Sequence, residues 1–263
     1  MNAYTHLWIA DVLALVGVVA LLFGSSFTSM RAAFARIRVD EATRGRLLKA
    51  VDARESAEQS LVPYTRLVGL IALLCAALEF APVPPLLPYA FFVLALSVTA
   101  LIVSSYALRA LPKRVALLQA RDAASVVPRY IFAVVSVQSL CALALVGEPA
   151  YRLSAVAVCV AGIVSTFVGW RLTYAPARLL GDDLPVEQFV DQRIRLNRAS
   201  MAVTMSGAPV MVLLGISQDN SPTLTVIAAF GLVWVMFVIQ MVWVFRAVNA
   251  PPKPDDLAAI HGS

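Results

Sequence analysis

The chain has 263 residues, of which 60% are hydrophobic and 14% are charged, and its mean hydropathy is +0.80. Soluble domains carry about 45–50% apolar and about 25% charged residues, so the composition excludes a single soluble core and also a disordered, collagen-like or coiled-coil chain. What remains is a chain embedded in lipid, with enough length for roughly six to eight spanning helices.

Long apolar runs predict an all-α polytopic membrane protein with seven transmembrane helices. Each run has the length, about 18–23 residues, that crosses about 30 Å of hydrocarbon as a helix. In the second run only twelve uncharged residues separate Arg66 from Glu79, so we expect both charges near the two interfaces. Gly207 and Pro209 predict a kink in the sixth run. The predicted helices lie near 7–28, 63–81, 86–108, 130–147, 153–171, 199–217 and 223–245.

The charged loops alternate between the two sides of this array. One side receives loops 29–62, 109–129 and 172–198 and the tail after 246. Together with the edge residues Arg66, Arg171 and Arg246, this side holds 20 of the 21 basic and 12 of the 16 acidic residues, a net +8. The other side has Arg152 against four acidic residues, a net −3. The basic side of membrane proteins faces the cytoplasm, so we expect the N-terminus outside, the C-terminus inside, and 29–62 as a cytoplasmic loop.

A short internal similarity predicts a repeated helical hairpin. Val62-Pro63-Tyr64 opens the second predicted helix and Val127-Pro128-Arg129-Tyr130 opens the fourth, and a Leu-Cys-Ala triplet follows each proline at nearly the same interval. Convergence of two membrane hairpins on similar ends is the alternative. The predicted architecture is therefore one leading helix followed by three hairpins, within a single transmembrane domain that spans 1–263.

Few residues are suited to catalysis or cofactor binding. The two histidines, His6 and His261, lie outside the predicted spans, which argues against bilayer haem ligation and an H-E-x-x-H metalloprotease. Cys75, Cys141 and Cys159 all fall in apolar runs and are expected to behave as buried free thiols rather than zinc ligands or disulfides. We therefore expect no cofactor and no metal, and the pattern disfavours an enzyme.

Ionisable and amide side chains within the spans are the candidate functional residues, because such groups are rare in lipid. Asp11, Glu79 and Arg152 lie near the outer side, either as a cation entry site or carboxylate–arginine gate, or as anchors at the wet interface. Gln138 and Gln240 lie deeper, either as links between helices or as the lining of a passage.

Two cytoplasmic loops carry further patterns. In 29–62, apolar residues such as Phe34, Leu47 and Val51 alternate with arginines, which predicts either an interfacial helix on anionic lipid or a solvated linker. The sequence Asp183-Leu184-Pro185 predicts a helix start. Acidic and basic residues are balanced in that loop, which gives no support for nucleic-acid binding.

Two functions are compatible with these features. The first is transport or permeation of a small solute or ion, with Asp11 and Glu79 at an outer vestibule. The second is a non-catalytic subunit of a larger membrane complex, with other subunits or a homo-oligomer as partners. Arginine supplies 18 of the 21 basic residues in an Ala-, Val- and Leu-rich chain, a composition typical of GC-rich bacteria, so we expect location in a bacterial inner membrane.

Overall fold

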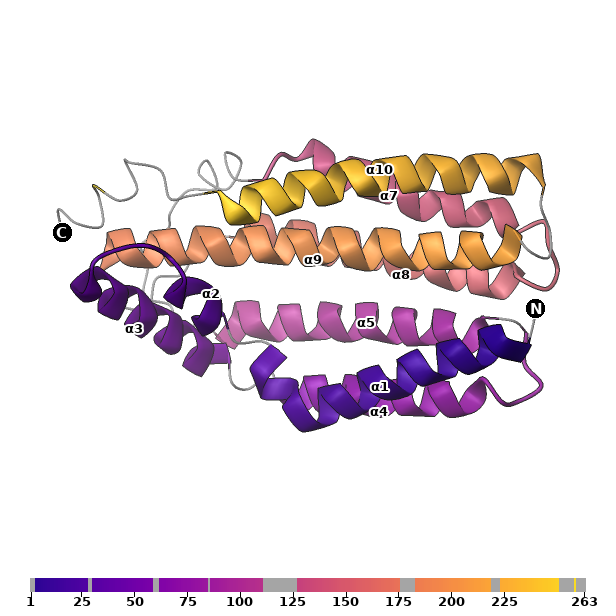
Figure 1. Cartoon of the computed structure of the whole chain (residues 1–263), viewed down its shortest axis with the longest axis horizontal. Coiled ribbons are helices and arrows are strands. Elements are labelled where there is room, and N and C mark those ends of the chain that lie inside the picture. The colour runs from indigo at the N-terminus through magenta and orange to yellow at the C-terminus, as the bar shows by residue number, and fades with distance from the viewer. Residues whose placement is uncertain are drawn as a thin grey trace.

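The computed structural model describes residues 3–27, 30–58, 62–84, 86–110, 127–175, 183–218, 223–250 and Ala258. All regular structure in these residues is helical. The helices run in chain order (Figure 1) as α1 (Ala3–Phe27), α2 (Arg31–Ala35), α3 (Glu41–Glu58), α4 (Val62–Leu78), α5 (Leu87–Ala110), α7 (Tyr130–Leu140), the 3₁₀ helix η2 (Cys141–Leu145), α8 (Arg152–Tyr174), α9 (Leu184–Gln218) and α10 (Leu224–Asn249).

Seven of these segments are apolar. Four are long and apolar enough to cross a membrane, and they cover Leu87–Ser105, Arg152–Tyr174, Pro185–Gln218 and Leu224–Ala247. The shorter apolar stretches are Trp8–Leu22, Tyr64–Leu78 and Tyr130–Leu145. These properties are those of a membrane-embedded helical protein.

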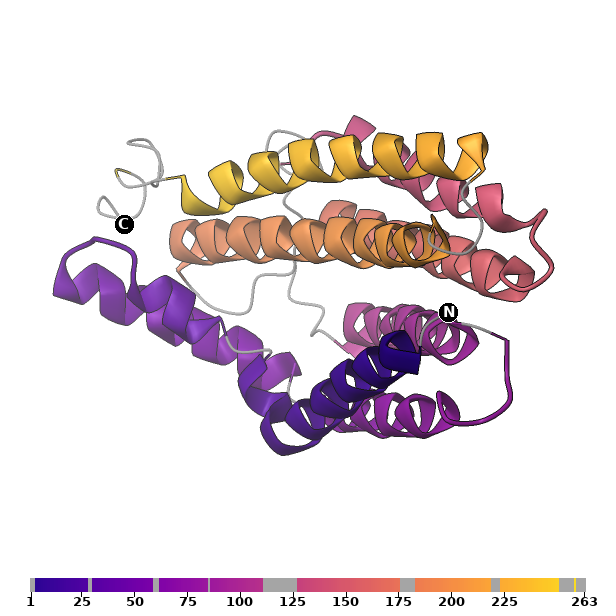
Figure 2. The ribbon, with the colours of Figure 1, turned by 45° about the vertical axis from the view of Figure 1, so that its right-hand side comes forward.

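The long helices form two groups that lie side by side (Figures 1 and 2). Helices α1, α4 and α5 form one group and α7, α8, α9 and α10 the other, and α5 joins the groups by packing along α8. The largest buried apolar cluster runs through both groups and includes Leu13, Ala72, Val93, Val158 and Leu213.

Glycines allow several helix pairs to approach closely. A Cβ atom on Gly69 of α4 would lie 2.9 Å from the carbonyl oxygen of Gly17 of α1, so the two backbones touch at this point. A Cβ atom on Gly169 of α8 would lie only 2.2 Å from Cβ of Ala202 on α9. Small residues at such crossings increase van der Waals contact between helices, which matters most where lipid removes the hydrophobic driving force.

The helices differ from the predicted runs in two places. Helix α9 begins at Leu184 instead of near 199, directly after the Asp183 that signals a helix start, and it continues through Pro209 as one helix. The fourth predicted run is an α-helix only to Leu140 and then a 3₁₀ turn from Cys141. Cys75, which matches Cys141 in the proposed repeat, lies inside the α-helix α4, so the two proposed repeats differ in structure at their cysteines.

The loop residues 111–126, 176–182 and 219–222 and most of the tail lie outside the described residues.

The charged segment 30–58 packs against the rest of the chain. Helix α3 buries Leu47 and Val51 against Val186, Phe189 and Val190 of α9, and Phe34 of α2 joins the same cluster. We call α2 and α3 the headpiece. Its apolar side chains therefore face α9, whereas the sequence predicted an interfacial helix on lipid or a solvated linker.

Candidate functional site

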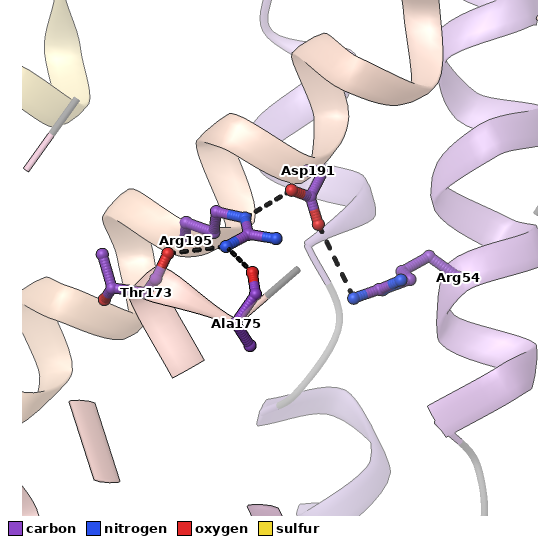
Figure 3. Close-up of polar contacts among 5 residues, drawn as sticks. All are labelled: Arg54, Thr173, Ala175, Asp191 and Arg195. Atoms are coloured by element: carbon purple, nitrogen blue, oxygen red, sulfur yellow. Dashed lines mark hydrogen bonds and ion pairs between the residues drawn. The ribbon is translucent and has the colours of Figure 1, made fainter. Parts of the chain in front are cut away.

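A buried polar network joins the headpiece to the end of α8 (Figure 3). Asp191 of α9 accepts a hydrogen bond from Nε of Arg195 one turn along the same helix, and its other oxygen lies 3.7 Å from the Arg54 guanidinium of α3. The side chains of Asp191 and Arg195 are 10% and 9% exposed, and that of Arg54 is 11% exposed. One carboxylate therefore neutralises part of the charge of two buried arginines.

Arg195 also closes the carboxyl end of α8. Its guanidinium donates to the carbonyl oxygens of Thr173, at 2.6 Å, and Ala175, at 2.5 Å. The last carbonyls of a helix have no partner within the helix and carry partial negative charge, so a cation at this position satisfies them and interacts favourably with the helix dipole.

Arg193 makes the equivalent contact with α10. Its guanidinium donates to the carbonyl oxygen of Ala250, the residue that follows α10, at 2.8 Å. Two arginines that are two residues apart on α9 thus cap the ends of two different helices. The contacts hold α8, α9 and α10 in register at one end of the molecule, which we call the basic end.

A second ion pair fixes the headpiece to the start of α9. Arg46 of α3 donates to both carboxylate oxygens of Asp183, at 2.6 and 2.9 Å. Asp183 also accepts a hydrogen bond from the backbone of Val186, as an N-cap residue does. The Arg46 guanidinium holds the pKa of Asp183 below its usual range, and Asp183 raises the pKa of Arg46. Both groups are therefore charged near neutral pH.

Other arginines of the basic end are exposed. Arg36 and Arg38 follow α2, Arg66 lies in the first turns of α4, and Arg246 lies in the last turn of α10. Arg171, by contrast, donates to Ser105 of α5 at 3.1 Å and links α8 to α5. The basic side chains thus divide into a set that ties helices together and a set that faces outward.

Small polar side chains join the apolar helices to one another. The hydroxyls of Ser97 on α5 and Ser165 on α8 lie 2.8 Å apart. The hydroxyls of Thr166 on α8 and Ser206 on α9 lie 3.2 Å apart, and Ser206 lies at the same distance from the carbonyl oxygen of Gly162. Each of these polar contacts connects two neighbouring helices.

The two predicted glutamines lie in the core of the second helix group. Gln138 of α7 is fully buried, and its Nε2 lies 3.5 Å from the carbonyl oxygen of Val233 on α10. Gln240 of α10 is 6% exposed. Within the described part of the chain, neither Oε1 of Gln138 nor either amide atom of Gln240 has a hydrogen-bond partner.

The three ionisable residues predicted at the outer side take different positions. Asp11 is exposed on α1, and Glu79 is buried in the turn after α4. Arg152 begins α8 and is exposed, and its Nε donates to the carbonyl oxygen of Val146 at 2.9 Å. Arg152 therefore satisfies a carbonyl in the connection before its own helix, which is a structural contact between η2 and α8.

The described residues offer little for metal or thiol chemistry. No group of three His, Cys, Asp or Glu side chains among them is placed to hold a metal ion. Cys75 and Cys159 are buried, Cys141 is half-buried, and all three are free thiols.

The sequence did not predict that Arg54, Asp191 and Arg195 lie together in one cluster. Asp191 and Arg195 are four residues apart beyond a predicted helix start, a spacing that places two side chains on the same helix face. That signal identifies their ion pair. Nothing in the sequence shows that Arg54, 137 residues earlier than Asp191, approaches the same carboxylate.

Comparison with protein families, with curated proteins and with solved structures finds no match to this chain.

Proposed function

We propose that the chain spans a bacterial inner membrane seven times, with the N-terminus outside and the basic end in the cytoplasm. The seven apolar helices of the described chain support this arrangement, and so does the concentration of arginine and lysine on one side of the predicted array. The exposed Arg36, Arg38, Arg66 and Arg246 then lie where anionic lipid headgroups offer counter-charges.

Within that membrane, the chain acts as a non-catalytic subunit of a larger complex. The observation that carries this proposal is the use of polar groups inside the helices. Ser97, Ser165, Thr166 and Ser206 are all buried, and they hydrogen-bond to neighbouring helices. Such contacts fix the arrangement of the helices, which supports a structural role for these groups. No nucleic acid is proposed as a partner.

Affinity purification in mild detergent, combined with flux measurements, tests this function. We expect a partner to co-purify in fixed stoichiometry. Under an imposed ion or solute gradient, we expect the flux across vesicles that contain the purified chain to be no faster than the flux across empty vesicles. The proposal fails if the purified chain carries a flux that Asp11→Asn or Glu79→Gln abolishes. In that case Asp11 and Glu79 form the entry site of a transporter.

Transport remains a second candidate because of Gln138 and Gln240. Burying an amide without a hydrogen bond costs about 1–3 kcal/mol, and lipid chains cannot supply the missing hydrogen bond. Water or a polar solute between α7, α9 and α10 would satisfy these groups. Under the subunit proposal, Gln240→Leu leaves assembly intact and stabilises the chain. Under the transport proposal, the same variant abolishes flux, whereas the conservative Gln240→Asn retains part of it.

A further inference from the structure

Asp11 places a carboxylate on a helix face that is otherwise apolar. It lies in the apolar stretch Trp8–Leu22, it is exposed, and it forms no ion pair or hydrogen bond within the described part of the chain. Lipid chains cover apolar side chains well, but they offer a carboxylate neither a counter-charge nor a hydrogen-bond donor. Exposed residues recur beside it every three or four positions along one side of α1. We call this set the Asp11 stripe, and it consists of Trp8, Asp11, Leu15, Val18 and Leu22.

Asp11 also lies well inside its helix. It is eight residues after Ala3, where α1 begins, which corresponds to about 12 Å along the helix. The start of α1 is level with the end of α9 and the start of α10 (Figure 1), at the end of the molecule opposite the basic end. Unlike lysine or arginine, aspartate has no long apolar stem with which to reach back to water. In the seven-span arrangement proposed above, its carboxylate therefore lies within the outer leaflet.

Helix α1 has room for another neighbour on this side. It packs chiefly against α4, and the residues that face α4, such as Ile9 and Leu13, are buried. Figures 1 and 2 show α1 and α4 together at one edge of the molecule. The Asp11 stripe therefore points away from the rest of the chain.

A second copy of the chain has no suitable cation for this position. Of the 21 basic residues, only Arg152 belongs to the predicted outer side. Arg152 is the first residue of α8, and its guanidinium already donates to the carbonyl oxygen of Val146. Because helical side chains lean toward the start of their helix, Arg152 leans outward, away from the depth of Asp11. A counter-charge for Asp11 must therefore come from a different protein.

We propose that Asp11 docks a transmembrane helix of a different subunit, through a lysine or arginine that this helix carries at the depth of Asp11. The inference rests on the proposed subunit function and names the class of its partner, an apolar helix with a cation in the outer leaflet. Opposite charges attract strongly at short range in such surroundings, because little water or salt screens them. The apolar members of the Asp11 stripe then pack against the apolar residues of the same partner helix.

Photo-crosslinking in the native membrane is the first part of the test. A photoreactive amino acid replaces either Leu15, one turn from Asp11 on the Asp11 stripe, or Val16, which is also exposed but points about 100° away from Leu15. From position 15 we expect a crosslink to a protein of different sequence, in an apolar segment that contains a lysine or arginine. From position 16 we expect no such crosslink.

Charge exchange is the second part. We expect Asp11→Asn to lower the amount of the crosslinked partner that co-purifies about tenfold or more, and Asp11→Glu to retain it. Asp11→Lys should also lose the partner, and replacing the partner's cation with aspartate should then restore the association. Because Asp11 is exposed and has no partner within the described chain, these variants should unfold in detergent at the wild-type temperature.

The failures of the two proposals give different results. If Asp11→Asn retains the partner in full, the inference is overturned and the subunit function stands. The inference is also overturned if the crosslink from position 15 reaches a second copy of the chain or a segment without a basic residue, or if the charge exchange does not restore association. If no protein crosslinks or co-purifies, the inference and the subunit function fail together.

Discussion

Asp191 shows how one carboxylate can determine the stability of the basic end. It lies between Arg195 and Arg54, and all three side chains are almost entirely buried. When one member of a buried ion pair is removed, the remaining charge stays away from water without compensation, which costs about 3–5 kcal/mol. At the surface the same loss costs about 0–1 kcal/mol, because water replaces the lost partner.

We therefore expect Asp191→Asn to lower the free energy of unfolding by about 3 kcal/mol or more. The matched control is Asp52→Asn, which removes the partner of Arg31 from an exposed pair at 2.9 Å and is expected to change stability by less than about 1 kcal/mol. Both are measured by chemical unfolding in mild detergent. Equal effects of the two variants would show that the Asp191 network is not buried as described.

The Arg46–Asp183 pair makes headpiece stability depend on pH. The pKa of Asp183 is lower in the folded chain than in the unfolded chain, where it is near 3.9. Such a group contributes stability that is fully present above the unfolded pKa and is lost as pH falls through the folded pKa. The loss therefore begins near pH 5 and is complete at pH values below the folded pKa.

The variant Asp183→Asn isolates this effect, because asparagine retains the N-cap of α9 but cannot ionise. At pH 7 it should unfold at a lower temperature than the wild type, and the difference should narrow as the pH falls below about 5. The measurement is the unfolding temperature of both proteins across this range. A difference that does not change with pH would mean that the ion pair contributes no stability.

Among the helices, the α1–α4 pair depends on direct backbone contact. A Cβ atom at Gly69 would lie 2.9 Å from both the carbonyl oxygen of Gly17 and Cγ of Leu21. Since a backbone oxygen cannot rotate away as a flexible side chain can, the helices must separate to admit even one methyl group.

Gly69→Ala is accordingly expected to destabilise the chain by about 1–3 kcal/mol. Gly45→Ala in α3 is the opposite case: it has open space around it, is exposed, and should stabilise by about 0.5–1 kcal/mol because alanine is the better helix former. Unfolding of both variants in detergent tests the pair. If Gly69→Ala stabilised the chain as Gly45→Ala does, α1 and α4 would not pack through these glycines.

The helices could be predicted from the sequence to different degrees. Apolar run length located the seven apolar helices, because the period and composition of a run are local properties. It did not find the first four turns of α9, where Asp191, Arg193 and Arg195 interrupt the apolar pattern. Nor did it find the docking of Leu47 and Val51 on α9, since an amphipathic helix buries its apolar face equally well against lipid or protein.

For the candidate residues, the same limit holds. The position of Gln138 and Gln240 in long apolar runs predicts that they lie in apolar helices but does not predict their burial, because only 17% of the most apolar window of α10 is buried. By contrast, the capping of α8 and α10 by Arg195 and Arg193 depends on how three helices end beside one another. No local pattern encodes that arrangement.

In the whole molecule, the helix groups meet along α5 and α8, and the headpiece forms a second connection between them. Helix α3 follows α1 and α2 in the chain but packs on α9 of the other group. At the opposite end lie the end of α4 and the start of α5, the turn between η2 and α8, and the end of α9 and the start of α10 (Figure 1). This polarity underlies the central proposal, a seven-span protein with its basic end in the cytoplasm.

Cysteine labelling in intact cells with a membrane-impermeant maleimide tests that proposal most directly. One cysteine at a time replaces Pro82 or Ala150, at the end opposite the basic end, or Ala42 or Ala53, on the exposed side of α3. The wild type with its three native thiols is the background. We predict that Pro82→Cys and Ala150→Cys react in intact cells, whereas Ala42→Cys and Ala53→Cys react only after the membrane is opened. Reaction of Ala42→Cys or Ala53→Cys in intact cells, or protection of Ala150→Cys, would contradict the seven-span arrangement with an external N-terminus.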